Sequence, residues 1–342
     1  MTTHPDLRPG GAAVATATSA VLENTAPPST LFDSLVVMWR IRFFEEEVMR
    51  LRAAGDIVGS VHLCNGQEAI YVGTCTALNL PDDLVFPTYR GHGWAIATGV
   101  PLDAMFGELL GREGGTNGGR GGSAYLSAPA YGMYGENSIV GAGAPIATGA
   151  ALASTFDGSG RVTVAAFGEG AMNQGAVHEA MNFAASRKLP VLFVIENNHY
   201  SELTPSDSMV TSDRFYKRGS AYGIPGVRVD GNDVEAVRAT VAYLVKKARD
   251  GGGPAIIEAM TERLVGHYIG DAQAYRPAGE VESASTREPI VRTENALVEA
   301  GMSRSELELA KERELDNVRQ AGARALQMPK ADPSTVRQHL YA

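Results

Sequence analysis

Oxygen-bearing side chains stand at both ends of the stretch GEGAMNQGAVHEAMNFAASRKLPVLFVIENN, which covers residues 168–198. Glu169 lies between two glycines at one end, and Asn198 lies at the other end. Glycines let backbone amides approach a diphosphate closely. A carboxylate and an amide oxygen suit Mg²⁺, which prefers oxygen ligands and commonly bridges phosphates. The stretch therefore predicts a site for a metal ion bound to a diphosphate.

These residues need a sheet edge that brings them together. Short β-rich runs alternate with helical segments, at residues 161–167, 190–195, 226–230 and 254–260. This alternation predicts an α/β fold with a parallel sheet flanked by helices. Glu169 follows the first run and Asn198 the second, at the strand ends where ligands bind in open sheets. A helix that begins near Ala171 would add the partial positive charge of its N-terminus.

Capping residues and apolar spacing predict two further helices. Thr30 is a candidate N-cap for a long helix that ends at Gly55. The second helix has Asn232 or Asp233 as its cap, valines at helical spacing, and Gly251 as its end.

The 342 residues are enough to bury a substantial core. Residues 1–29 are rich in Ala, Thr, Pro and Gly, and this composition predicts a disordered tail. Residues 30–342 are predicted to form one domain, which turns charged and helical from about residue 279. A glycine-dense loop at 111–122 suits close backbone approach rather than packing.

Composition and charge exclude several classes of partner. The formal net charge is −9 and the basic residues are scattered, so we expect no nucleic acid and no acidic membrane surface as partner. No apolar run approaches the roughly 20 residues that span a bilayer, and no signal peptide is visible. The two cysteines, Cys64 and Cys75, are too few for a disulfide framework and lack zinc-site spacing. These features predict a cytoplasmic protein.

Each candidate residue also has an ordinary structural explanation. Glycines commonly end strands, Asn-Asn commonly occupies turns, and a lone glutamate is usually a solvated loop acid. A dinucleotide-binding loop is not supported, because Asn173 stands where the third glycine of G-x-G-x-x-G is needed. No stretch reads G-x-x-x-x-G-K-[ST], so a nucleotide P-loop is not expected.

Several motifs in order resemble the α subunit of 2-oxo acid dehydrogenase E1 components, which use thiamine diphosphate. The sequence Gly168-Glu169-Gly170, then twenty-six residues, then Asn197-Asn198 is similar to the thiamine-diphosphate motif. The likeness continues through VHLCNGQEA, PTYRGHG, GGRGGSAYL, GENSIVGAGAP and GHYIGDAQAYR, and it covers roughly residues 30 to 330. The last of these stretches resembles the acetoin dehydrogenase type of α subunit.

By position, the resemblance assigns roles to individual residues. It implies that Mg²⁺ is held by Glu169, Asn198 and the carbonyl oxygen of Tyr200. It implies two catalytic residues, His62 near the reacting substrate and His267, and imidazoles can move protons near neutral pH. The residues that match cofactor contacts are Tyr89, Arg90, Ser138, Val140, Gly168, Glu169, Gly170, Ala171, Asn198 and His267.

The resemblance also implies partners and a reaction. A β subunit would complete the cofactor site in an α₂β₂ heterotetramer. The enzyme would cleave acetoin, pyruvate or a related small oxo compound and transfer the acyl unit to the lipoyl group of an E2 protein. Two alternatives stay open. One is transfer of a two-carbon ketol unit to a carrier-protein thiol. The other is a non-catalytic thiamine-diphosphate sensor or scaffold, suggested because Glu169 replaces the family's usual Asp.

Overall fold

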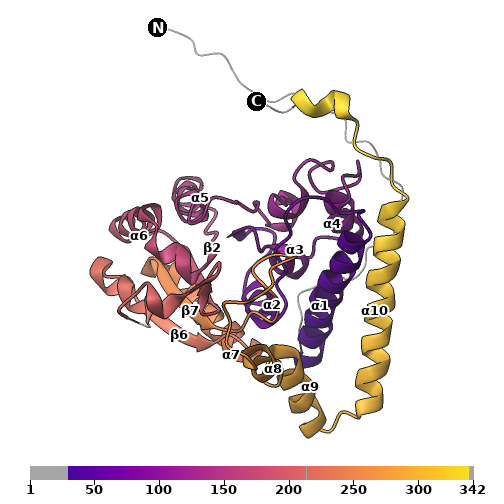
Figure 1. Ribbon diagram of the computed structural model, residues 1–342. Coiled ribbons are helices and arrows are strands. Elements are labelled where there is room, and N and C mark those ends of the chain that lie inside the picture. Colours follow the sequence, from indigo (N-terminus) through magenta and orange to yellow (C-terminus); the bar gives the residue numbers. More distant parts are fainter. Residues whose placement is uncertain (1–29, 213, 339–342) are drawn as a thin grey trace.

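A five-stranded sheet forms the centre of the computed structural model, which describes residues 30–212 and 214–338 (Figure 1). The predicted disordered tail at 1–29 lies outside the described residues. All four strand pairings of this sheet are parallel, which confirms the predicted fold class. In spatial order the strands are β1 (Leu84–Pro87), β2 (Thr163–Gly168), β3 (Val191–Asn197), β7 (Ala255–Met260) and β6 (Gly226–Asp230).

Four of these strands match the predicted runs within two residues. Strand β1 was not predicted, because a run of four residues that ends in proline is a weak strand signal. In the register of β2 and β3, Gly168 pairs with Glu196. The residues that follow these two strands therefore meet at one edge of the sheet, as predicted.

Helices cover both faces of the sheet. Along β2, Val164 and Ala166 pack into the core on the side of α1 (Leu31–Ala53), α2 (Glu68–Thr76) and α7 (Val234–Lys247). The alternate residues Ala165 and Phe167 pack on the other side, against α5 (Gly143–Asp157) and α6 (Gly175–Arg187). This alternation leaves the strands buried on both faces, as parallel sheets require.

The predicted helix caps are present. The side chain of Thr30 accepts a hydrogen bond from the Asp33 amide, and the Asp33 carboxylate accepts one from the Thr30 amide, which confirms the start of α1. Between the two candidates for the α7 cap, the structure uses Asp233, whose carboxylate accepts from the amides of Glu235 and Ala236.

The chain is mainly helical from about residue 279, as predicted. Helix α10 (Arg304–Leu326) runs beside α1 along one side of the molecule, opposite α5 and α6 (Figure 1). Within residues 30–212 and 214–338, no helix is both long and apolar enough to cross a membrane. The remaining helices are α3 (His92–Ala97), α4 (Leu102–Leu109), α8 (Glu280–Ser285), α9 (Pro289–Glu299) and α10 (Arg304–Leu326).

The segment after α10 returns to the glycine-dense loop. Lys330 pairs with Arg112 in an antiparallel bridge. On either side of this bridge, the amide of Glu113 donates to the Pro329 carbonyl at 3.0 Å, and the amide of Ala331 donates to the Gly111 carbonyl at 3.0 Å. The end of the described chain is therefore tied to a loop that lies far from it in the sequence.

Candidate cofactor and metal site

A pocket lies where β2 and β3 end. It brings together ten of the residues named above, and only His62 and Ser138 of the predicted site residues are not in its lining. The lining consists of Thr88, Tyr89, Arg90, Val140, Gly168, Glu169, Gly170, Ala171, Glu196, Asn198, Tyr200, Ser201, Glu202, Arg263 and His267.

His62 lies next to this lining although it is not part of it. Its ring centroid is 4.4 Å from that of Tyr89 and 4.8 Å from that of His267. Its Nδ1 atom is buried and has no hydrogen-bond partner among the described residues. Ser138 is partly buried and stands two positions before Val140, and its role in cofactor binding stays a prediction.

Glu169 is a buried carboxylate whose two oxygens have unequal surroundings. The residue is 1 % exposed. Its Oε1 atom accepts a hydrogen bond from the Ser206 hydroxyl at 2.6 Å, whereas Oε2 is buried without a partner among the described residues. Burial raises the pKa of Glu169, and the Ser206 hydrogen bond opposes that effect. A buried carboxylate oxygen without a partner is costly, and a cation would satisfy it.

The amide of Asn198 has a defined orientation. Its Nδ2 atom donates to Oε1 of Gln67 at 2.8 Å. The other end of the amide, Oδ1, accepts only a long 3.3 Å hydrogen bond from the Tyr200 amide. Asn198 thus keeps an oxygen with spare acceptor capacity in the pocket that Glu169 lines.

The two glycines around Glu169 have different surroundings. A Cβ atom on Gly170 would collide with the side chain of Ser201, so this glycine allows close packing against the hairpin that follows β3. A Cβ atom on Gly168 would meet only the Glu196 carbonyl, at 4.0 Å, so the space beside Gly168 is open. Of the two, only Gly168 leaves room on the pocket side for another group.

The prediction that an α-helix begins near Ala171 is wrong. Residues Glu169–Asn173 form a 3₁₀ turn, closed by a hydrogen bond of 2.9 Å from the Gln174 amide to the Ala171 carbonyl. The extended backbone of Gln174 then separates this turn from α6, whose first residue is Gly175. The helix N-terminus therefore lies four residues further along the chain than predicted.

Two guanidinium groups line the pocket. Arg90 is buried, and its Nη atoms donate to the carbonyls of Leu63 and His267. These two bonds fix the orientation of the group and leave other N–H donors for phosphate oxygens.

The sequence analysis missed Arg263. Its Nη2 atom donates to the Tyr275 hydroxyl at 2.6 Å, and its Nε atom is buried without a partner among the described residues. The available signal was its position, three residues after the end of β7.

Both histidines, His62 and His267, have pKa values below the usual range of an imidazole. Burial, together with the charge of Arg90, lowers the pKa of His62 to about 3. The same two causes lower the pKa of His267 to about 4. In the protein without a ligand, neither imidazole is therefore expected to carry a second proton near neutral pH, and the catalytic roles of both histidines stay predictions. An anionic group beside them would raise both pKa values.

Glu196 is a second buried acid that the sequence analysis did not assign to the site. It accepts hydrogen bonds from Trp94 Nε1 at 2.8 Å, from Gln67 Nε2 at 3.2 Å and from the Tyr71 hydroxyl at 3.2 Å. Burial raises its pKa to about 7, and the Trp94 hydrogen bond opposes that rise. Unlike Glu169, this carboxylate has partners for both oxygens.

The donor set suits a metal ion that arrives with a diphosphate. The pocket offers one spare carboxylate oxygen and one amide oxygen for the ion, with Arg90, Arg263 and Tyr89 for the phosphates. In the part of the chain that the structure describes, no three His, Cys, Asp or Glu side chains are grouped to hold a metal ion. An ion in this pocket would need further oxygen ligands from its partner molecule.

Comparisons with known proteins identify the family of this chain. The family model of the dehydrogenase E1 component matches residues 37–334. The α subunit of acetoin:2,6-dichlorophenolindophenol oxidoreductase from Cupriavidus necator is 43% identical over 282 residues, which are 81% of this chain and 84% of that protein. The subunit of the same name from Bacillus subtilis is 44% identical over 262 residues, 76% of this chain and 78% of that protein.

A third relative has a different name. The pyruvate dehydrogenase E1 component subunit alpha from Rhizobium meliloti is 41% identical over 265 residues, 77% of this chain and 76% of that protein. The predicted resemblance is confirmed, and the chain belongs to the dehydrogenase E1 component family, among its thiamine-diphosphate-dependent α subunits.

Proposed function

We propose that this α subunit binds thiamine diphosphate together with Mg²⁺ in the pocket at the ends of β2 and β3, and that its enzyme cleaves acetoin. The unpartnered Oε2 atom of Glu169 carries this proposal, because a buried anionic oxygen is stabilised by a bound cation. Two of the relatives named above are acetoin enzymes, and this supports acetoin over pyruvate as the substrate.

In this proposal each residue has a defined task. Glu169, Asn198 and the carbonyl of Tyr200 hold the ion. Tyr89, Arg90 and His267 bind the diphosphate, with the guanidinium group of Arg263 in the same pocket. Bound thiamine diphosphate supplies an electron sink for cleavage of the bond next to an oxo carbon.

The remaining predicted residues surround these ligands. Gly168, Gly170, Ala171, Ser138 and Val140 approach the cofactor through their backbone. His62 is uncharged and has a free Nδ1 atom beside the ring of His267. It can therefore accept a hydrogen bond from the substrate.

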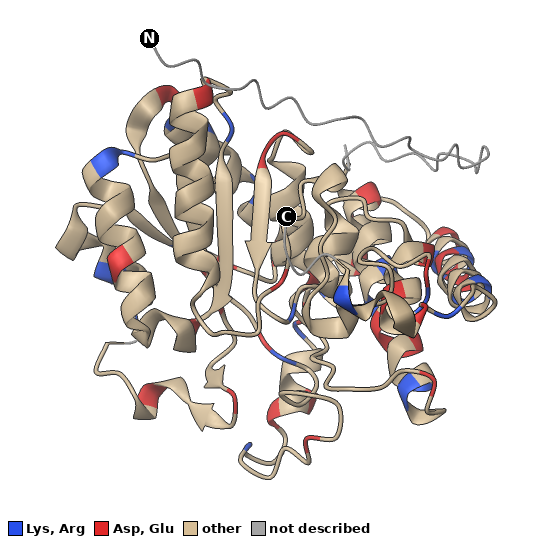
Figure 2. Cartoon of the chain, turned by 90° about the horizontal axis from the view of Figure 1, so that it is seen from above, with Lys and Arg blue, Asp and Glu red and all other residues tan. Residues whose placement is uncertain are grey.

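An apolar stripe on α5 supports a β subunit as the partner. Ile146, Gly149, Ala153 and Phe156 lie at helical spacing on the exposed side of α5, and Phe156 is 82 % exposed. Val140, six positions before Ile146, is also exposed and lines the pocket. Figure 2 shows charged positions crowding α10, which is seen end-on at the right, whereas the helices at the left carry few. Exposed apolar stripes of this kind mark association surfaces.

Finer features of the assembly belong to this proposal as well. They are the α₂β₂ stoichiometry, acyl transfer to a lipoyl-bearing E2 protein, and a cytoplasmic location. The resemblance implies a regulatory serine directly after the histidine that corresponds to His267 in pyruvate-specific mitochondrial relatives, and Tyr268 stands at that position here. We therefore expect no serine-type kinase control at this position.

The test measures cofactor binding and turnover in protein co-expressed with a β-type chain. Calorimetric titration of thiamine diphosphate with and without Mg²⁺ compares Glu169→Gln with the matched control Glu202→Gln, another acid of the same pocket. We expect thiamine diphosphate binding to depend on Mg²⁺ in the control and to be independent of Mg²⁺ in Glu169→Gln. Glu169→Asp should retain much of the Mg²⁺ dependence, because it keeps the anionic ligand.

Turnover separates the remaining alternatives. Acetoin should be consumed faster than pyruvate with an artificial electron acceptor. Equal cofactor binding in wild type and Glu169→Gln would contradict the metal assignment. Binding without turnover of either substrate would favour the sensor or scaffold, and transfer of a two-carbon unit to a carrier-protein thiol would favour the ketol transferase.

A further inference from the structure

A chain of buried hydrogen bonds leads away from the pocket behind Asn198. The amide Nδ2 of Asn198 donates to Gln67 Oε1 at 2.8 Å. The opposite end of the Gln67 amide, Nε2, donates to the Tyr71 hydroxyl at 2.7 Å and to Glu196 Oε2 at 3.2 Å. Gln67 is fully buried and is not in the pocket lining. We propose that Gln67 is a positioning residue that turns the Asn198 amide so that its oxygen faces the metal ion.

The far end of this chain of bonds fixes its direction. The indole N–H of Trp94 can only donate, and it donates to Glu196 Oε1 at 2.8 Å. The other oxygen of Glu196, Oε2, accepts from the NH₂ group of Gln67 and from the Tyr71 hydroxyl. With its NH₂ group on this side, the Gln67 amide has its oxygen on the opposite side, facing Asn198.

Orientation matters because the two ends of an amide act oppositely on a cation. An asparagine turned by 180° would present two N–H groups to the ion in place of an oxygen. Because Gln67 Oε1 accepts from Nδ2, the turned state of Asn198 would bring two amide oxygens together. The proposal rests on the proposed function, which makes Asn198 a ligand of Mg²⁺.

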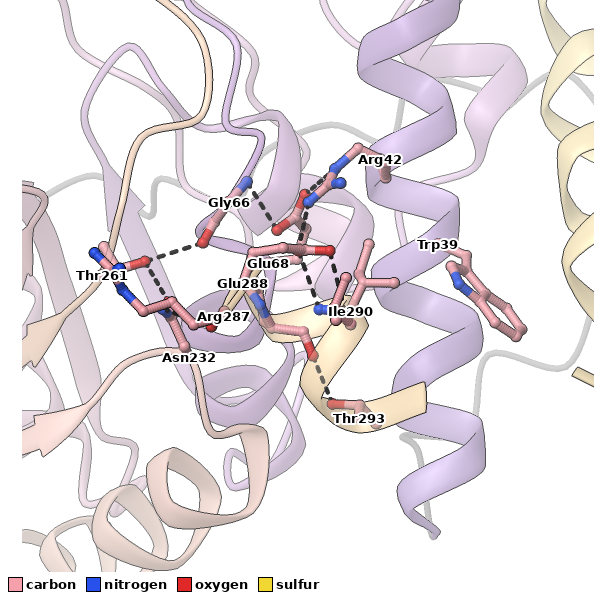
Figure 3. Close-up of polar contacts among 12 residues, drawn as sticks. Trp39, Arg42, Gly66, Glu68, Asn232, Thr261, Arg287, Glu288, Ile290 and Thr293 are labelled. Atoms are coloured by element: carbon pink, nitrogen blue, oxygen red, sulfur yellow. Dashed lines mark hydrogen bonds and ion pairs between the residues drawn. The ribbon is translucent and has the colours of Figure 1, made fainter. Parts of the chain in front are cut away.

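The backbone on both sides of Gln67 is held in place (Figure 3). The Gly66 amide donates to Glu68 Oε2 at 3.0 Å, and the Gly66 carbonyl accepts from the Thr261 hydroxyl at 3.0 Å. Gly66 has a φ of +98°, and a Cβ atom there would collide with the Glu262 carbonyl. Only glycine therefore fits at the position that leads into Gln67.

A buried ion pair anchors the residue that follows Gln67. Glu68 Oε1 accepts from Nε of Arg42 at 2.7 Å, and Nη2 of the same arginine donates to Glu288 at 2.8 Å. Figure 3 shows Arg42 on α1 reaching both glutamates. Glu288 also caps α9, since it accepts from the amides of Ile290 and Val291. Helices α1, α2 and α9 thus fix the segment that carries Gln67.

The experiment separates positioning from simple core packing. It measures the Mg²⁺ concentration that gives half-maximal thiamine diphosphate binding, and thermal stability, in protein co-expressed with a β-type chain. Gln67→Leu should raise that concentration about tenfold or more, the usual effect of losing a partner of a metal ligand. Tyr71→Phe is the control, because it removes a hydroxyl from the same cluster and leaves the bond between Gln67 and Asn198 intact.

A double variant gives the decisive comparison. Aspartate presents an oxygen in either orientation, so Gln67→Leu should cause no loss of Mg²⁺ affinity in an Asn198→Asp background. A loss there, or equal losses in Gln67→Leu and Tyr71→Phe, would overturn the positioning role. If Asn198→Ala leaves the Mg²⁺ dependence unchanged, the proposed metal site fails. If thiamine diphosphate binding loses its Mg²⁺ dependence in Asn198→Ala and Gln67→Leu leaves the required Mg²⁺ concentration unchanged, only the positioning role fails.

Discussion

Two glycine-rich segments each surround a buried glutamate, and the two glutamates differ in how their oxygens are satisfied. In the loop at 111–122, both oxygens of Glu108 accept backbone amides: those of Asn117 and Gly119 on Oε2, and those of Gly121 and Gly122 on Oε1. In the turn after β2, Oε1 of Glu169 accepts one hydrogen bond, from the Ser206 hydroxyl, and Oε2 has no partner among the described residues.

The difference shows which glycine-rich segment is suited to a ligand. The loop at 111–122 closes on a carboxylate of its own chain, and a Cβ atom on Gly115 would lie 2.5 Å from Glu108 Oε2. The backbone of this loop does approach another group closely, as predicted, but that group is the carboxylate of Glu108. Between these two segments, the unsatisfied buried oxygen of Glu169, and not the glycine content, distinguishes the one that lines the pocket.

Replacing each glutamate by glutamine should give the largest difference in stability between the two segments. We expect Glu108→Gln to destabilise the protein by about 3–5 kcal/mol, because amides that had a charged acceptor would face an NH₂ group. Glu169→Gln should instead stabilise the cofactor-free protein by about 1 kcal/mol, since it removes a desolvated charge. Urea unfolding of the cofactor-free variants measures both. Similar losses in both variants would mean that Glu169 also has a structural partner.

Replacing single glycines of the two segments by alanine should lower stability in the closed loop more than beside the pocket. Gly119→Ala should cost about 2–4 kcal/mol, because its φ is +74° and a Cβ atom would lie 2.6 Å from the Gly111 carbonyl carbon. Gly170→Ala should cost about 1–3 kcal/mol through its collision with Ser201. Gly168→Ala should change stability by less than about 0.5 kcal/mol and still weaken cofactor binding, because only the open side of the pocket is filled.

Thermal unfolding and calorimetric titration of the same three variants would check this order. A stable Gly119→Ala variant would mean that the closed loop is looser than the structure shows. Unchanged cofactor affinity in Gly168→Ala would remove the open side of Gly168 from the binding site.

The last expected effect is a dependence of stability on pH. His62 and His267 have pKa values lowered to about 3 and about 4. The folded state therefore binds fewer protons than the unfolded state, so stability is lost as the pH falls below the unfolded value of about 6.5. From pH 7 to pH 5 we expect a loss of about 1 kcal/mol for each histidine, discounted for partial exposure.

The raised pKa of Glu169 acts in the opposite direction, since protonation of this buried acid favours the folded state as the pH falls. His62→Asn should reduce the loss between pH 7 and pH 5 in urea unfolding of cofactor-free protein. An equal loss in wild type and His62→Asn would show that the His62 pKa is not lowered.

Much of the fold follows from local signals in the sequence. The capping residues Thr30 and Asp233 each satisfy nearby amides, and the buried strands are continuous apolar runs, so short stretches were enough to predict them. The 3₁₀ turn at Glu169–Asn173 was not predictable in this way. It depends on the contact of Gly170 with Ser201, which lies beyond the next strand.

The site was partly predictable for the same reason. Glu169 and Asn198 follow adjacent strands, so the sheet order alone brings them together. Arg263 and Gln67 gave no local signal, because their roles come from partners distant in the sequence, such as Asn198 for Gln67 at 131 positions. The neutral state of His62 arises from burial and from Arg90, and spacing cannot show either.

The bridge between Lys330 and Arg112 bears on how the chain folds during its synthesis. Arg112 also donates to the Met328 carbonyl, 216 positions later in the chain. At the usual 5–20 residues per second, a ribosome takes about 10–40 s to make that length. During this interval the glycine-dense loop can close around Glu108, but its outer edge stays unpaired and open to proteases. Pairing of this edge therefore waits until the segment after α10 has been made and has reached the loop.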